Sequence, residues 1–231
     1  MGRKILFLGS IGVLAETSEI QREAYNEALA EAGLNWNWDV ETYRELLQSA
    51  GGMDRLRLLS DATGAALSDR QIKQIHARKT EIACARIIDV GVQLRPGIGE
   101  IIEACLQRET PIGLVTSTYP PNIRALQNGA GGKLPLERFA VIVSREDIAF
   151  GKPHPAAYTY ALETTGFGPD EAIAVEDTAL SALSARQAGV DVCVTPGDYT
   201  NKQELLGYER MREAVIHDTT SVFEKIASKL F

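Results

Sequence analysis

Hydroxyl, lysine and carboxylate side chains occur in that order along the second half of the chain, at points where apolar runs end. The segment Thr116-Ser117-Thr118 follows the run 112–115, Lys152 lies in a later loop, and Glu176-Asp177 follows the run 173–175. Hydroxyls and a lysine can hold the oxygens of a phosphate group. Paired carboxylates are ligands suited to Mg²⁺. These residue types therefore indicate a site for a phosphorylated small molecule.

Each of these residues also has a purely structural explanation. Thr116 could be the N-cap of a helix, and Lys152 could be a solvated loop lysine. The pair Glu176-Asp177 could stabilise the start of the following helix. A functional site is favoured by their joint position at successive strand ends, on the side of the sheet where α/β proteins bind ligands.

Short apolar runs that alternate with helical patterns predict the elements that must position these residues. Five strands are expected, at Ile5–Leu8, Ile112–Val115, Phe139–Val143, Ile173–Val175 and Val190–Val194. After residue 95, helices are expected at Gly99–Gln107, Pro121–Gln127, Pro155–Thr165, Ala179–Ala188 and Ser221–Lys229. Alternation of this kind predicts an α/β fold with a parallel sheet covered on both faces.

The segment 17–91 contains no convincing strand. Its helical patterns run through Glu19–Ala32, Val40–Gln48, Asp54–Asp61 and Asp69–Ile88. We therefore expect a helical module over 17–91, inserted after the first strand, and an α/β core made of 1–16 and 92–231. A ligand would lie in the cleft between the two parts.

The composition limits the classes of partner. A net charge of −7 argues against nucleic acid as a partner, because a phosphate backbone needs a basic surface. The cysteines, Cys84, Cys105 and Cys193, are odd in number and fit neither a zinc site nor a redox pair. Their apolar neighbours indicate core residues. With no disulfide framework and no long apolar segment, we expect a cytoplasmic protein without a membrane partner.

The segments around Thr116, Lys152 and Glu176-Asp177 resemble motifs II, III and IV of the haloacid dehalogenase superfamily, whose members are mostly Mg²⁺-dependent phosphatases. The helical insertion resembles the C1-type cap of that superfamily, which implies a Rossmann-like core with an all-helical cap. Within the superfamily the chain is similar to the CbbY branch, whose members remove phosphate from sugar bisphosphates such as xylulose-1,5-bisphosphate. Six segments carry this similarity, in order: GLNWNWDVETYRELL, GGMDRL, ARKTEI, LRPGIGEII, VTSTYPPNI and VTPGDYT.

The first motif of that family lacks its two aspartates in this sequence. The family pattern Phe-Asp-x-Asp-Gly-(Thr/Val)-Leu falls on residues 8–14, so Gly9 stands at the position of the nucleophile and Ile11 at that of the general acid/base. Covalent phosphoryl transfer to an enzyme carboxylate needs that carboxylate. A general acid or base is typically worth about 10²–10⁴-fold in rate. The resemblance thus implies a phosphatase site with impaired catalysis.

The resemblance also assigns roles to the residues that remain. Phosphate would be bound by Thr116, Ser117 and Lys152. Mg²⁺ would be bound by Glu176 and Asp177, more weakly than in a complete site, because the first motif no longer supplies its carboxylate. The positions expected to face the substrate in or beside the cap are Glu16, Gln21, Arg55 and Lys79, and Gln21 stands where the family usually has a histidine.

Three neighbours of these motifs carry further expectations. Lys152 is expected to pair with Glu176 or Asp177, because only two carboxylates remain at the site. Ser10 is expected to face away from the cleft if position 9 faces it, since alternate side chains of a strand point to opposite sides. His154 is expected to be an exposed loop histidine.

Three functions stay open on the sequence alone. The first is a catalytically impaired protein that keeps the fold and binds a sugar phosphate or a protein partner. The second is an active hydrolase in which a metal-activated water at Glu176 and Asp177 attacks the phosphate. The third is a structural or interaction protein with a vestigial cleft, which neither Mg²⁺ nor sugar phosphates would stabilise.

Overall fold

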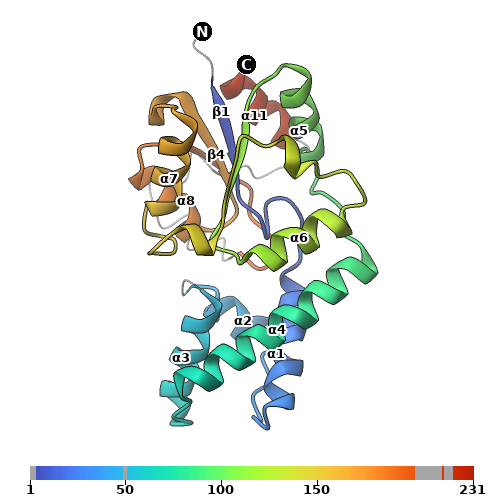
Figure 1. The fold of residues 1–231 in the computed structure, drawn as a ribbon, viewed down its shortest axis with the longest axis vertical. Coiled ribbons are helices and arrows are strands. Elements are labelled where there is room, and N and C mark those ends of the chain that lie inside the picture. Colours follow the sequence, from blue (N-terminus) through green and yellow to red (C-terminus); the bar gives the residue numbers. More distant parts are fainter. Residues whose placement is uncertain (1–3, 49–50, 201–214, 216–220) are drawn as a thin grey trace.

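A computed structural model describes residues 4–48, 51–200, 215 and 221–231. Its centre is a sheet of five parallel strands in the order β3-β2-β1-β4-β5 (Figure 1). The strands are β1 Ile5–Leu8, β2 Ile112–Val115, β3 Val141–Val143, β4 Ala172–Glu176 and β5 Asp191–Val194. The predicted α/β fold with a parallel sheet is confirmed, and each strand lies within about two residues of its predicted bounds.

Both faces of the sheet are buried under helices. Leu6 and Leu8 of β1 pack with α5, α6 and α11, whereas Ile5 and Phe7 pack with α7 and α8 on the other face. The strands are therefore apolar on both sides, as expected for a parallel sheet between two helical layers. The covering helices are α5 Ile98–Gln107, α6 Pro120–Gly129, α7 Ala156–Thr165, α8 Ala179–Gln187 and α11 Val222–Leu230.

Four helices between β1 and α5 form a separate group, which lies beyond one end of the sheet (Figure 1). They are α1 Ser18–Glu31, α2 Val40–Leu46, α3 Gly52–Thr63 and α4 Asp69–Val90. Helix α4 begins at a capping box made by Ser68 and Gln71. Helix α1 buries one face against an apolar cluster of this group, with the helical spacing Ala24, Tyr25, Ala28 and Leu29. We call this group the cap; the boundaries that divide 17–91 from the core stay a prediction.

The remaining turns and the cysteines complete the fold. Short 3₁₀ helices lie at Leu136–Arg138, Arg145–Asp147 and Pro169–Glu171. Cys105 and Cys193 are buried, Cys84 is half-buried, and all three are free thiols that pack in or against the core, in agreement with their predicted place. Among the described residues, no helix is long and apolar enough to cross a membrane.

Candidate functional site

A cavity of about 380 Å³ lies between the carboxyl edge of the sheet and the cap. At this edge β1 lies between β2 and β4, and ligands of open α/β sheets bind at such a switch in strand order. Every residue predicted to bind phosphate, metal or substrate lines the cavity: Glu16, Gln21, Arg55, Lys79, Thr116, Ser117, Lys152, Glu176 and Asp177. The fold therefore brings together the predicted residues of the core and of the cap.

The space beside Gly9 is filled by the carboxylate of Glu176. A Cβ atom placed on Gly9 would lie 2.6 Å from Oε2 of Glu176 and 2.9 Å from Cγ2 of Val13. Both distances are well below the roughly 3.5 Å of favourable packing between atoms. The Gly9 amide donates to Val175 O at 3.0 Å, which holds this backbone against β4. A carboxylate from the neighbouring strand thus occupies the place that a side chain at position 9 would take.

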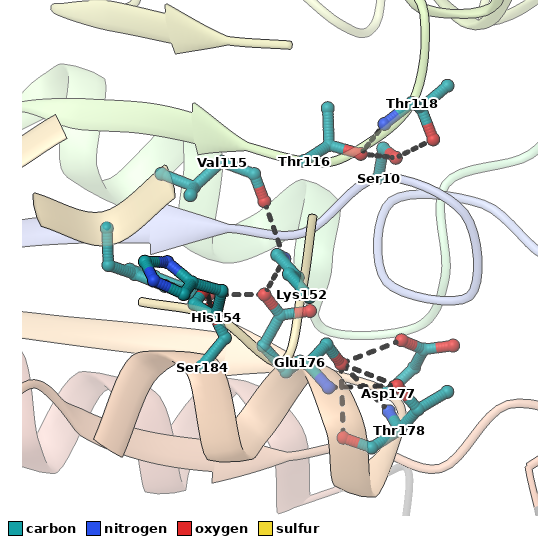
Figure 2. A network of polar contacts seen from close by, with 12 residues as sticks. Ser10, Val115, Thr116, Thr118, Lys152, His154, Glu176, Asp177, Thr178 and Ser184 are labelled. Carbon is teal, nitrogen blue, oxygen red and sulfur yellow. Dashed lines mark hydrogen bonds and ion pairs between the residues drawn. The ribbon is translucent and has the colours of Figure 1, made fainter. Parts of the chain in front are cut away.

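Lys152 and Glu176 form a buried ion pair at this edge (Figure 2). Lys152 Nζ also donates to Val115 O at 2.9 Å. The hydroxyl of Tyr158 donates to the oxygen that Lys152 contacts, Oε1 of Glu176. Lys152 is 7% exposed and Glu176 is 1% exposed, so loss of either partner would leave a buried charge uncompensated. The predicted pairing of Lys152 with one of the two carboxylates is confirmed, for Glu176.

Ser10 points into the cavity, so the prediction that it faces away is wrong. Its Oγ lies 2.7 Å from Oγ1 of Thr116 and 3.4 Å from Oγ1 of Thr118 (Figure 2). Strand β1 ends at Leu8, so the alternation of a strand does not extend to position 10. The chain turns there instead, and the amide of Leu14 donates to Ser10 O at 2.8 Å.

The structure does not place Thr116, Lys152 or Glu176-Asp177 in the purely structural positions considered for them: the N-cap of a helix, a solvated loop and the first turn of a helix. The N-cap position of helix α6 is Tyr119, whose side chain makes no capping hydrogen bond, and not Thr116. Helix α8 is capped by Thr178, and its first turn contains no acidic residue. Lys152 is buried and not solvated. Thr116, Lys152, Glu176 and Asp177 all line the cavity.

Asp177 lies against the loop that follows β1. Its Oδ2 would be 2.2 Å from a Cβ atom on Gly12, whose φ is 77°, so both the backbone and the carboxylate require glycine at that position. Burial, followed by the charges of Glu176 and Glu16, raises the pKa of Asp177 to about 7. The carboxylate therefore has less negative charge near neutral pH than an ordinary aspartate.

The donor set at this edge does not match the Mg²⁺ centre that the family resemblance implies. Gly9 and Ile11 supply no carboxylate, and Oε1 of Glu176 already accepts from Lys152 and Tyr158. Because an ammonium group contacts this oxygen, a divalent cation there would meet like charge at close range. Across the part of the chain that the structure describes, no group of three or more His, Cys, Asp or Glu side chains is placed to hold a metal ion.

A second set of basic groups lines the cavity from the cap. Lys79 of α4 donates to Oε1 of Gln21 and lies 4.5 Å from the centre of the Tyr25 ring. Burial, reinforced by the charge of Arg55, lowers the pKa of Lys79 to about 7. Burial, with the charges of Lys79 and Arg55, lowers the pKa of His76 to about 4. The cavity thus has basic groups on the cap side as well as Lys152 on the sheet side.

Segment 195–200 connects the sheet edge to the cap. The amide of Asp198 donates to Oε2 of Glu16 at 2.9 Å. Arg95 donates to Thr195 O at 2.8 Å and also to a carbonyl of the loop after β1. Glu16 therefore fixes the start of the cap to this segment, besides lining the cavity.

Sequence reasoning missed Tyr158 and His76 as parts of the site. Tyr158 lies on the buried face of α7, where an aromatic residue ordinarily belongs to the core, so its spacing gave no sign of a polar role. His76 precedes Lys79 by three residues on α4, which places both on one face of the helix and was a usable signal. His154 is exposed, as predicted.

Comparison with known proteins places the chain in a family. Residues 11–189 match the family model of haloacid dehalogenase-like hydrolases. Protein CbbY of Cereibacter sphaeroides is 36% identical over 204 residues, which are 88% of this chain and 88% of that protein. Protein CbbY of Rhodobacter capsulatus is 36% identical over 200 residues, 87% of this chain and 88% of that protein.

Solved structures show the same likeness. The crystal structure of CbbY from Rhodobacter sphaeroides in complex with phosphate has a TM-score of 0.85, at 31% identity and over 96% of each chain. A mutant of that CbbY in complex with xylulose-(1,5)bisphosphate also has a TM-score of 0.85, at 31% identity, over 95% of this chain and 96% of that one. Since the family model covers most of the chain and relatives are 36% identical over nearly its whole length, this chain belongs to the haloacid dehalogenase-like hydrolases, in the CbbY-like branch.

Proposed function

We propose that this protein binds a phosphorylated sugar in the cavity between sheet and cap, and that it is impaired as a phosphatase. The observation that carries the proposal is the carboxylate of Glu176 beside Gly9. By resemblance, position 9 is where the family places the carboxylate that accepts the phosphoryl group. Here that position has no side chain, and the carboxylate in its space is engaged by Lys152 and Tyr158. Covalent transfer to position 9 has no acceptor.

The distribution of charge supports a ligand with two phosphate groups. Lys152, Thr116 and Ser10 line the cavity from the sheet, and Lys79 and Arg55 line it from the cap. Each set offers donors for the oxygens of one phosphate. A CbbY relative binds xylulose-(1,5)bisphosphate, and a molecule of this class would place one phosphate at each set. We therefore propose a sugar bisphosphate as the ligand.

The two other hypotheses have less support. A metal-activated water needs a divalent cation at Glu176 and Asp177, and the ammonium of Lys152 opposes one there. A vestigial cleft gives no reason for Lys79 to stay buried beside the cavity, because its partners in the described structure, Gln21 and the Tyr25 ring, carry no charge. Burial of a charged group costs free energy unless a partner or a ligand compensates it.

The test measures binding and turnover in the same preparation. The wild-type chain is titrated calorimetrically with xylulose-1,5-bisphosphate, and phosphate release is followed for the wild type and for Gly9→Asp/Ile11→Asp. We expect saturable binding by the wild type and phosphate release at least about 10³-fold slower than in the double variant, because both carboxylates are restored there. Gly9→Asn/Ile11→Asn adds side chains of the same size without carboxylates and should release no phosphate.

Two outcomes would contradict the proposal. One is a wild-type chain that does not bind the bisphosphate. The other is phosphate release by the wild type that disappears in Asp177→Ala, which would favour the metal-activated water.

The contribution of the cap to binding is tested by comparing Lys79→Met with Lys73→Met, a change at an exposed lysine of the same helix. We expect about tenfold weaker binding or more in the first, and wild-type affinity in the second.

A further inference from the structure

We propose that Lys152 acts in place of the divalent cation, so that the phosphate of the ligand binds at the sheet edge without Mg²⁺. This inference rests on the proposed binding function. The complete family site, as the resemblance describes it, holds four carboxylates and needs a cation before a phosphate can approach. Two of these carboxylates are absent at Gly9 and Ile11, so most of that need is gone.

The remaining charge is balanced by a contact within the protein. Lys152 pairs with Glu176, and Tyr158 donates to the same carboxylate oxygen. The other oxygen, Oε2, lies in the space beside Gly9. A divalent cation at Oε1 of Glu176 would therefore have to displace an ammonium group and a hydroxyl, and one at Oε2 would bind the carboxylate that the ammonium already neutralises. Gly9 and Ile11 add no carboxylate, so a metal ion would have only Oε2 of Glu176 and Asp177 as carboxylate ligands, next to the charge of Lys152.

Lys152 is also oriented to serve an anion. An ammonium group has three N–H donors. In the described structure one donates to Val115 O at 2.9 Å and one to Glu176, so one N–H remains for a ligand in the cavity that Lys152 lines. The hydroxyls of Ser10 and Thr116, 2.7 Å apart, line the same cavity; one donates to the other, and the second hydroxyl proton can turn toward a phosphate oxygen. These donors reach the phosphate without a bridging cation.

The experiment compares binding with and without the metal. The wild-type chain is titrated with xylulose-1,5-bisphosphate in excess EDTA and again in millimolar Mg²⁺, and separately with MgCl₂ alone. We expect the two dissociation constants to agree within about threefold and MgCl₂ alone to give no saturable heat. Affinity at least tenfold higher in Mg²⁺ would overturn the inference and leave the proposed binding function standing. Failure to bind under either condition would overturn both.

Two variants make the comparison independent of the wild-type result. Gly9→Asp/Ile11→Asp restores the carboxylates, and we expect its binding to weaken at least tenfold when Mg²⁺ is removed. Lys152→Met is combined with Glu176→Gln, so that no buried carboxylate is left unpaired. This second double variant should keep the wild-type circular dichroism spectrum and lose at least tenfold in affinity in EDTA. Full metal-free affinity in that variant would show that Lys152 does not hold the phosphate.

Discussion

The space beside Gly9 can be probed with a single methyl group. In Gly9→Ala the new Cβ would lie 2.6 Å from Oε2 of Glu176, so the carboxylate must shift within its contacts to Lys152 and Tyr158. We expect the free energy of unfolding to fall by about 1 to 3 kcal/mol, because a buried charged hydrogen-bond network is displaced. Urea unfolding of the purified variant measures this.

Gly151→Ala is the matched control at the same edge. The nearest atom to a Cβ there is Cβ of Ser117 at 4.0 Å, which is ordinary contact. This change should alter the free energy of unfolding by less than about 1 kcal/mol, since an unstrained glycine to alanine change acts mainly on the unfolded chain. If Gly9→Ala and Gly151→Ala have the same free energy of unfolding, then Glu176 does not occupy the space that an added Cβ at position 9 would take.

The titration of Lys79 should make ligand affinity depend on pH. Burial and the charge of Arg55 lower its pKa from 10.5 to about 7. At pH 8 the free protein therefore holds Lys79 mostly neutral, and a bound phosphate favours the charged form. We expect binding at pH 8 to take up close to one proton, and affinity to decline as the pH rises further above 7. Calorimetry in buffers of different ionisation enthalpy measures the uptake.

The same titration separates Lys79 from other lysines of the cap. Lys79→Met should abolish most of the proton uptake at pH 8, and Lys73→Met, at an exposed position of the same helix, should leave it unchanged. If the wild type and Lys79→Met take up the same number of protons, then the group that titrates on binding is not Lys79.

At the scale of elements, segment 195–200 fastens the core to the cap. Tyr199 is 9% exposed and belongs to the apolar cluster of the cap, and its hydroxyl donates to Glu19. Its ring centre lies 5.7 Å from that of Tyr43. Arg44 of α2 donates to the neighbouring carbonyl, Asp198 O, at 2.9 Å. A core segment therefore supplies a side chain to the packing of the cap.

Removal of the Tyr199 ring should destabilise α2 more than the other helices. We expect Tyr199→Ala to lower the free energy of unfolding by about 3 kcal/mol, as for a large side chain packed in a core. Hydrogen exchange should accelerate in α2 and stay unchanged in α7, on the far side of the sheet edge. Tyr199→Phe, which loses only the bond to Glu19, should cost about 1 kcal/mol. Unchanged protection of α2 in Tyr199→Ala would contradict this role.

At the scale of the whole molecule, the cavity joins basic groups from two parts of the chain. In the proposed binding mode, a bisphosphate engages Lys152 on the sheet and Lys79 on the cap, which both line the cavity, whereas a monophosphate of the same sugar engages one of them. A charge-assisted interaction is worth about 1.5 to 3 kcal/mol, so we expect the monophosphate to bind at least tenfold more weakly. Competition titrations measure the ratio. Equal affinities would show that only one set of basic groups binds phosphate.

Much of the fold follows from local patterns. The strand Ile5–Leu8 has its predicted bounds, because an unbroken apolar run ending at Gly9 suits a strand buried on both faces. The long helix of the cap, predicted at Asp69–Ile88, ends at Val90 before Gly91. The candidate site could be assembled on the same basis, because residues that follow parallel strands meet at one edge of the sheet.

The contacts made inside that edge depend on the tertiary structure. Ser10 meets Thr116 across 106 positions of sequence, and Tyr199 meets Glu19 across 180. No periodicity of a single segment encodes such pairs, since they arise from the strand order and from the path of the chain after β1 ends. The sequence by itself determined that Thr116, Lys152 and Glu176-Asp177 follow strand ends that meet at one edge, and that Gly9 and Ile11 bring no carboxylate to it. Only the tertiary structure decided that Glu176 fills the space at Gly9, because the position of a buried side chain depends on which neighbours pack around it.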